Sequence, residues 1–212
     1  MQLRFIALAS LAFAGVAFAA PDDTPVPAPA GVTDVTFYQV AYSSNLLIGD
    51  SYVNLTNTGT LNGFDPAGRI CVNVYTFDPS EELISCCACP VTPDGLKSLS
   101  AKQDLVSNTL TPGVPGSIVV KLLATAPVGG ACNPSSPTAT NLVGGMRAWE
   151  TSLHQNTVTG NYEITENAFA TSVLSVSELA KLTTYCGFIQ ANGSGFGICK
   201  SCRLGGLGGA QQ

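Results

Sequence analysis

The sequence predicts a mainly β protein: an antiparallel β-sandwich, Ig-like or jelly-roll-like, with one C-terminal helix docked on it and disulfides as staples. Three observations support this prediction. Short runs of alternating or β-branched residues are separated by frequent turn residues, as in sandwiches and barrels. One capped helical pattern lies near the C-terminus. The chain also has eight cysteines, an even number that favours disulfides in an exported protein.

The strands are predicted from residue alternation and from the turn residues between the runs. The segments 78–80 (Asp-Pro-Ser) and 159–161 (Thr-Gly-Asn) are turn signals that would join the flanking runs into hairpins. The apolar run Ile118–Leu123 is bounded by prolines and is typical of a buried strand. The predicted strands are Val32–Val40, Tyr52–Thr56, Ile70–Phe77, Leu83–Cys89, Ile118–Leu123, Met146–Leu153 and Tyr162–Thr165.

One helix is predicted, over Val176–Gln190. Ser175 and Glu178 form a capping box, in which each side chain would accept a hydrogen bond from the other residue's backbone amide. An apolar stripe at helical spacing predicts that the helix docks on the sheet. The stripe consists of Leu179, Leu182, Cys186 and Ile189.

The two ends of the chain differ from the domain between them. Residues 1–19 combine a positive charge, an apolar stretch and a small-residue cleavage site, which predicts a secretory signal peptide. Residues 20–31 are Pro-rich and predict a stiff linker. Residues 32–203 predict a single sandwich domain that includes helix 176–190, and residues 204–212 a flexible Gly-rich tail. The predicted location is therefore secreted: extracellular, periplasmic or at the cell surface.

Composition excludes some partners. Without Arg4 the mature chain would carry 8 basic against 14 acidic residues, a poor composition for binding nucleic acid. No other stretch reaches the roughly 20 apolar residues of a membrane span, so a soluble mature chain is expected. Charged residues make up only 11% of the chain, so Ser, Thr, Asn and Gly must supply much of the polar surface.

All eight cysteines are predicted to form disulfides, and one pairing can be argued from the strands. In a hairpin of 70–77 with 83–89, residues whose numbers add up to about 160 face each other. Cys71 would then pair with Cys89, or with Cys87 on the same face. Cys186 would tether the helix to the sheet or to Cys132. The remaining partners would fasten the Gly-rich segment. The cysteines are Cys71, Cys86, Cys87, Cys89, Cys132, Cys186, Cys199 and Cys202.

Two C-x-x-C pairs leave two alternatives open. Cys86, Cys89, Cys199 and Cys202 could together hold a metal ion in a four-cysteine site, although their separation is far outside the spacing of a zinc ribbon. A redox-active C-x-x-C is the other alternative, but these motifs usually open a helix and the Gly-rich setting of Cys199 predicts none. An oxidising compartment favours structural disulfides over both.

The sequence contains no catalytic constellation. His154 is the one histidine and is predicted to lie at a strand end, without a free thiol as partner. Glu81 with Glu82, and Glu163 with Glu166, are the carboxylate pairs that a glycosidase would need, and solvated acids are the simpler interpretation. No nucleotide or phosphate-loop motif is complete, so no cofactor is expected.

A few residues could serve binding instead. Trp149 and Tyr162 could contribute to an aromatic surface for a sugar or peptide, although core packing is the simpler role. Asp78 with Glu81 and Glu82 could hold calcium, but their spacing matches no calcium loop. Asn54 and Asn192 begin glycan acceptor sequons.

Three strings carry a resemblance to known proteins. They are residues 69–75 (RICVNVY), 86–93 (CCACPVTP) and 195–203 (GFGICKSCR). In these strings the chain resembles an uncharacterised family of secreted, cysteine-containing bacterial proteins. The resemblance covers most of the mature chain and implies a bacterial exported protein. Since the family has no assigned activity, it implies no site residues.

Together these features favour a secreted, non-enzymatic protein with a structural, surface or binding role. The alternatives are a carbohydrate- or peptide-binding module and a hydrolase of unrecognised type. The partner is unknown: a surface glycan, a peptide or a second copy of the chain would each fit. Self-association stays open because an exposed edge strand can accept a strand from another chain.

Overall fold

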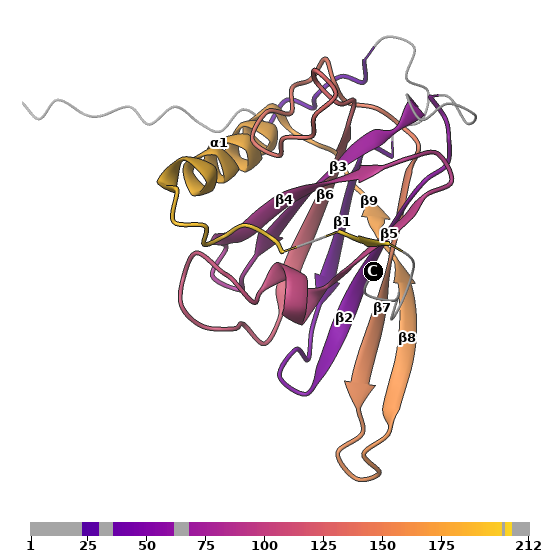
Figure 1. Cartoon of the computed structure of the whole chain (residues 1–212), viewed down its shortest axis with the longest axis vertical. Coiled ribbons are helices and arrows are strands. Elements are labelled where there is room, and N and C mark those ends of the chain that lie inside the picture. The colour runs from indigo at the N-terminus through magenta and orange to yellow at the C-terminus, as the bar shows by residue number, and fades with distance from the viewer. Residues whose placement is uncertain (1–22, 30–35, 62–67, 201, 205–212) are drawn as a thin grey trace, which may run out of the picture.

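The computed structural model contains two antiparallel sheets, each of five strands (Figure 1). The structure describes residues 23–29, 36–61, 68–200 and 202–204. The predicted signal peptide, 1–19, and residues 205–212 of the predicted tail lie outside the described residues. The predicted fold class, a two-sheet antiparallel β protein with one C-terminal helix and disulfides, is confirmed.

The strand order of each sheet differs from the chain order. Sheet 1 has the order β4-β3-β6-β1-β9 and sheet 2 the order β10-β5-β2-β7-β8. The strands of sheet 1 are β1 (Tyr38–Ser43), β3 (Ile70–Phe77), β4 (Leu83–Val91), β6 (Ile118–Thr125) and β9 (Ala170–Thr171). Those of sheet 2 are β2 (Gly49–Asn57), β5 (Leu96–Ser100), β7 (Met146–Gln155), β8 (Tyr162–Ala168) and β10 (Arg203–Leu204). The helix α1 spans Val176–Asn192, and Ala101–Leu105 forms a short π-helix.

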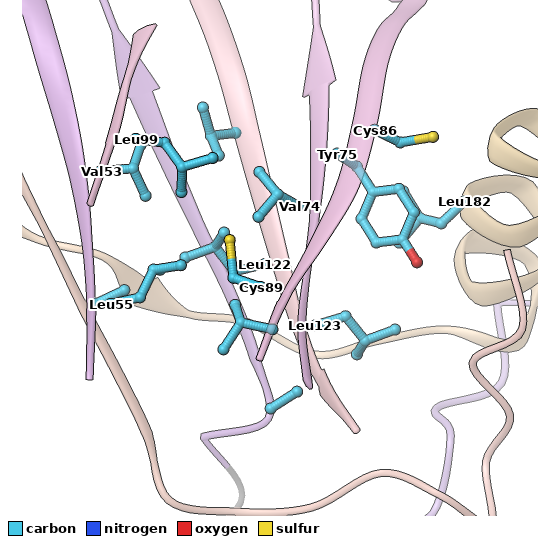
Figure 2. Packing of buried hydrophobic residues seen from close by; sticks show 14 of the residues in the cluster. Val53, Leu55, Val74, Tyr75, Cys86, Cys89, Leu99, Leu122, Leu123 and Leu182 are labelled. Atoms are coloured by element: carbon cyan, nitrogen blue, oxygen red, sulfur yellow. The ribbon is translucent and has the colours of Figure 1, made fainter. Parts of the chain in front are cut away.

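Apolar side chains pack on both faces of sheet 1. Figure 2 shows Val74 and Leu122 of sheet 1 facing Val53 of sheet 2, while Tyr75 points to the other face, toward α1. All eight residues of β3 are buried for this reason. A strand covered on both faces can be apolar throughout, and β3 reads ICVNVYTF, with only two polar residues.

Strand β3 has the bounds that the sequence predicts. Four other strands extend beyond their predicted ends, namely β4, β6, β7 and β8. The structure adds β5, β9 and β10, which were not predicted. β5 has only five residues, and β9 and β10 have two each. Elements this short hold too few residues for alternation to stand out from chance.

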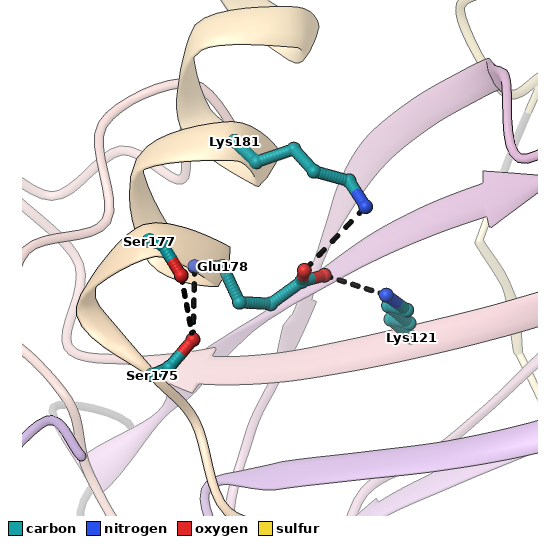
Figure 3. Close-up of polar contacts among 5 residues, drawn as sticks. All are labelled: Lys121, Ser175, Ser177, Glu178 and Lys181. Atoms are coloured by element: carbon teal, nitrogen blue, oxygen red, sulfur yellow. Dashed lines mark hydrogen bonds and ion pairs between the residues drawn. The ribbon is translucent and has the colours of Figure 1, made fainter. Parts of the chain in front are cut away.

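The predicted helix is confirmed, and one of the two hydrogen bonds of the predicted capping box is present. The Glu178 amide donates to the Ser175 hydroxyl at 3.1 Å. The Glu178 carboxylate instead binds Lys121 of β6 at 2.6 Å and Lys181 at 3.5 Å (Figure 3). This network ties the first turn of α1 to sheet 1. The helix ends at Gly193, whose φ of 69° gives the left-handed cap that glycine favours.

Part of the Pro-rich segment packs on the domain. The Val26 amide donates to the Leu174 carbonyl at 2.7 Å, and the Val176 amide donates to the Thr24 carbonyl at 2.8 Å. Val26 is buried in the core cluster. These contacts attach Thr24–Val26 to the domain, and Val26 is the apolar side chain that this part of the predicted linker buries.

Four disulfides join the eight cysteines, and three of them start on β4. One fastens α1 to sheet 1, as one of the two predicted alternatives had it. Two fasten the C-terminal segment, as predicted. The pairs are Cys71–Cys132, Cys86–Cys186, Cys87–Cys199 and Cys89–Cys202.

The predicted pairing of Cys71 with Cys89 or Cys87 is wrong. Phe77 pairs with Leu83, as the predicted register requires, but Thr76 pairs with Ser85, so Ile84 is the extra residue of a β-bulge. Beyond the bulge Cys71 lies opposite Pro90 and Cys89 lies opposite Val72. A shift of one residue turns a side chain to the other face of the sheet. Cys71 therefore points away from the side of Cys87 and Cys89 and bonds Cys132.

The C-terminal segment covers the edge of sheet 1. The Cys86 amide donates to the Gly197 carbonyl at 2.8 Å, and Cys86 and Ile198 form a parallel bridge. The segment then reaches sheet 2, where β10 pairs with β5. Because Cys202 directly precedes β10, the Cys89–Cys202 disulfide links the two sheets.

Candidate binding groove

The two C-x-x-C motifs do not form the sites that their spacing suggests. Cys86 bonds Cys186 and Cys89 bonds Cys202, so neither motif is paired within itself. Cys199 bonds Cys87, and no cysteine is free. The four-cysteine metal site and the redox-active C-x-x-C were therefore wrong as alternatives, because every sulfur that they need lies in a crossed disulfide.

The structure does not bring His154 to a free thiol, or Glu163 to Glu166, as a catalytic pair would require. His154 lies on β7 with its Nδ1 at 3.3 Å from the Asn45 amide nitrogen, and its cross-strand neighbour is Glu163. Glu166 lies opposite Thr151, so Glu163 and Glu166 point to opposite faces of β8. A glycosidase needs two carboxylates that flank one bond. This pair cannot provide them.

The predicted aromatic surface does not form either. Trp149 lies opposite Ala168, and Tyr162 lies opposite Gln155, six positions further along β7. Six residues of strand span roughly 20 Å. Trp149 is half-buried and Tyr162 is exposed, so the two rings do not share one binding surface.

Of the two glycan acceptors, only Asn192 is exposed. Asn54 is buried in sheet 2, donates to the Thr151 hydroxyl at 3.0 Å and accepts from the Ser98 hydroxyl at 2.7 Å. A glycan on Asn54 is incompatible with this packing.

A groove of about 500 Å³ lies between α1 and the turn that joins β3 to β4. We call it the α1 groove. Its size falls within the range of small-ligand sites, and most of its surface is apolar. It is lined by Glu81, Glu82, Leu83, Leu110, Thr184, Tyr185, Phe188 and Ile189.

The helical period places two aromatic rings on this groove. The buried stripe of α1 consists of Leu182, Cys186 and Ile189, as predicted, with Leu179 partly buried. Tyr185 and Phe188 lie three residues apart beside this stripe, so their side chains are neighbours on the helix surface. Tyr185 is 48% exposed and Phe188 is 64% exposed. Two large rings left in contact with water beside an apolar floor are typical of a binding surface.

The floor of the groove is held in place. Leu83 and Ile189 are buried, and the amide of the half-buried Leu110 donates to the Ile84 carbonyl at 2.9 Å. The Cys86–Cys186 disulfide joins β4 to α1 between Tyr185 and Phe188. A wall that is fixed before binding loses little freedom when a ligand arrives.

The rim of the groove is acidic. Glu81 and Glu82 are exposed, and neither forms an ion pair within the part of the chain that the structure describes. No Lys, Arg or His lines the groove. Lys181 is the basic residue of α1 that precedes the groove residues, and its ammonium group is directed to Glu178 and to the Phe77 ring.

The turn that carries these carboxylates has a defined shape. The Asp78 carboxylate accepts from the amides of Ser80 and Glu82, each at 2.9 Å. Because the Asp78 carboxylate accepts these two hydrogen bonds, it is turned into its own loop and is not directed toward a calcium ion shared with Glu81 and Glu82. Glu81 has a φ of 67°, a left-handed conformation that costs a side-chain-bearing residue about 1–2 kcal/mol.

The groove offers contact surface and charge rather than reactive groups. Its lining has hydroxyl groups and carboxylates but no thiol, imidazole or amine. Of its residues, the sequence analysis names Glu81 and Glu82 as candidate site residues, for another role, and Ile189 as part of the apolar stripe of the helix. Tyr185 and Phe188 were missed. Aromatic residues flanking the predicted apolar stripe of the helix were the signal that could have revealed them.

Comparisons with family models, with curated proteins and with solved structures find no match to the chain. The resemblance to a secreted bacterial family therefore stays a prediction. Four disulfides are typical of an extracellular protein. No helix in the described part of the chain combines the length and apolarity that crossing a membrane requires.

Proposed function

We propose that the protein is exported and acts outside the cytoplasm as a non-enzymatic binding protein, with the α1 groove as its ligand site. The observation that carries the proposal is the pair of exposed rings, Tyr185 and Phe188, over a floor held by the Cys86–Cys186 disulfide. Leaving both rings in water has no benefit for folding, whereas a ligand that covers them gains the free energy of burying apolar surface.

The predicted leader and the disulfides support export. A disulfide framework persists in an oxidising compartment, and residues 1–19 have the composition of a signal peptide. Secreted protein should therefore begin near Ala20, with all eight cysteines oxidised. Intact mass spectrometry after alkylation tests both points, and an uncleaved chain or an alkylated thiol would contradict the proposal.

The binding role is tested with a neutral apolar probe. Indole is titrated into the oxidised mature protein while amide chemical shifts are followed by NMR. Saturable shifts should map to Leu110, Thr184 and Phe188. The variant Phe188→Ala should weaken these shifts, whereas Val158→Ala, at an exposed position outside the groove, should not. Shifts elsewhere, or no saturation, would reject the groove as the ligand site.

A further inference from the structure

We infer that the α1 groove binds a cationic peptide segment, with an apolar side chain in the groove and an Arg or Lys side chain at its acidic rim. The inference rests on the proposed function and names the class of ligand. Its evidence is the juxtaposition of the carboxylates of Glu81 and Glu82 with the rings of Tyr185 and Phe188 around one apolar floor.

The floor selects an apolar group. Leu83, Leu110 and Ile189 offer no polar side-chain atom, and Thr184 is the single aliphatic hydroxyl of the lining. A sugar that entered this groove would lose water from hydroxyl groups that the floor cannot pair, at a cost in affinity. An aliphatic or aromatic side chain loses nothing of this kind and gains by burial.

The rim selects a cation. Glu81 and Glu82 are consecutive, and no basic residue lines the groove to offset them. The whole chain has a net charge of −5, which adds to the attraction of a positive ligand and repels a negative one. An exposed pair with a ligand cation contributes little alone, but two carboxylates beside an apolar anchor decide between ligands of opposite charge.

The rings add a second contact for the same cation. Lys and Arg are attracted to the face of an aromatic ring within about 6 Å of its centre. The protein itself uses this arrangement beneath α1. Lys121 lies 2.6 Å from the Glu178 carboxylate and 4.7 Å from the centre of the Phe77 ring. A ligand cation between the rim carboxylates and Tyr185 would repeat this combination.

A peptide supplies both groups at a suitable spacing. Successive side chains of an extended peptide point to opposite faces, and residues two positions apart lie on one face about 6.6 Å apart, so an apolar residue and an Arg two positions later reach floor and rim together. The groove is open on the side of the exposed residues Glu81, Tyr185 and Phe188, which leaves room for a backbone to pass.

The test uses matched peptides on the oxidised mature protein. The probes are acetyl-Gly-Leu-Phe-Arg-Arg-Gly-amide, in which each apolar residue has an Arg two positions later, the same peptide with citrulline for each Arg, and the same with Glu for each Arg. Citrulline keeps the shape of Arg without its charge. Binding is followed by the NMR shifts of Leu110, Thr184 and Phe188. We expect the Arg peptide to bind about five- to tenfold more tightly than the citrulline peptide, and the Glu peptide to bind least.

Two pairs of variants locate the charge effect. Glu81→Gln with Glu82→Gln should reduce the affinity for the Arg peptide to that for the citrulline peptide. Glu163→Gln with Glu166→Gln changes the net charge equally on β8 and should leave the preference intact. Equal loss in both variants would overturn the inference, because it would indicate attraction by net charge alone.

The remaining outcomes separate the inference from the proposed function. If indole and all three peptides bind equally well and Phe188→Ala weakens them all, the groove binds apolar groups but the cationic ligand is wrong. If the Glu peptide binds best, the inference is also overturned. If neither indole nor any peptide shifts the groove residues, both the inference and the binding role fail.

Discussion

Cys86 and Cys87 are consecutive residues of β4, and their side chains leave opposite faces of sheet 1. Cys86 lies opposite Tyr75 and bonds Cys186 of α1, whereas Cys87 lies opposite Val74 and bonds Cys199 of the C-terminal segment. One dipeptide in a strand thus anchors two separate elements, because successive residues of a strand alternate in direction.

The two disulfides should differ in what they stabilise. Cys86→Ser with Cys186→Ser, and Cys87→Ser with Cys199→Ser, should each lower the free energy of unfolding by about 2–4 kcal/mol in urea denaturation. Only the first pair of substitutions should also raise the hydrogen exchange of α1 and weaken indole binding, because it releases the wall of the groove.

A crossed pair of substitutions checks the connectivity. Cys86→Ser with Cys199→Ser removes one cysteine from each of two disulfides and leaves Cys87 and Cys186 without their partners. This variant should show two alkylatable thiols in the denatured state, whereas each matched pair should show none. Free thiols in a matched variant would contradict the observed pairing.

Glu81 should be replaceable by glycine with a gain in stability. Its φ of 67° is strained for a residue with a side chain, and glycine adopts it freely. After subtraction of the extra chain entropy of glycine, Glu81→Gly should raise the free energy of unfolding by about 0.5–1 kcal/mol. Chemical denaturation measures this.

Glu82→Gly is the matched control. Glu82 lacks a positive φ, so glycine relieves no strain there and should lower stability. Both substitutions remove a rim carboxylate, and both should weaken the binding of the Arg peptide to the α1 groove. A Glu81→Gly variant that is more stable and yet binds the Arg peptide less tightly would show that the conformation of Glu81 lowers stability while its carboxylate serves binding. Equal stability changes at the two positions would mean that the turn holds no strain at Glu81.

The sequence predicted what depends on local pattern. The bounds of β3, the stripe of α1 and the Ser175 cap each follow from a run of neighbouring residues. The Cys71 pairing failed because a single extra residue, Ile84, changed the register of a hairpin, and nothing in the local sequence marks that bulge. Disulfide pairing depends on such a shift, since one position decides which face a cysteine occupies.

The candidate site was harder to predict for a related reason. The α1 groove combines a turn at residues 78–82, a loop residue, Leu110, and one side of a helix more than seventy positions later. Tyr185 and Phe188 look like ordinary helix residues in the sequence. Their exposure follows from how the helix is rotated on sheet 1, which the Cys86–Cys186 disulfide and the Lys121–Glu178 ion pair fix through tertiary contacts.

Tyr75 should make stability depend on pH in the alkaline range. Its hydroxyl donates to the Pro134 carbonyl at 2.7 Å beneath α1, and burial raises the pKa of Tyr75 well above its ordinary value. A tyrosine in the unfolded chain ionises near pH 10, whereas Tyr75 in the folded protein is still neutral at this pH. Above this pH the unfolded state loses a proton that the folded state keeps. The free energy of unfolding should therefore fall, by up to about 1.4 kcal/mol per pH unit from this group.

Tyr75→Phe removes this contribution. The variant should be about 1 kcal/mol less stable at neutral pH, because the Pro134 carbonyl loses its donor. Its stability should fall less steeply than that of the wild type above pH 10, and the two curves should run parallel below pH 9. Brief urea titrations across this range measure both curves. Identical slopes above pH 10 would mean that the folded state does not hold Tyr75 neutral.

The edge strand β8 should resist pairing because of its charges. The Phe169 amide donates to the Ala148 carbonyl, and the Asn156 amide donates to the Asn161 carbonyl. Odd-numbered residues of β8 therefore bond β7, and the backbone groups of Tyr162, Ile164 and Glu166 point away from it. All seven residues of β8 are exposed, and the strand ends its sheet among the residues that the structure describes.

Such an edge is a template for a second chain unless charge protects it. Two copies of β8 pairing antiparallel would bring Glu163 and Glu166 of each strand close together. The wild type should therefore stay monomeric in sedimentation velocity experiments across a wide concentration range. Glu163→Thr with Glu166→Thr removes the charges and raises β propensity, so this variant should form dimers or larger species as concentration rises. Glu81→Gln with Glu82→Gln changes the net charge equally and should stay monomeric. Association of this control, or a wild type that already dimerises, would show that charge on β8 is not what keeps the copies apart.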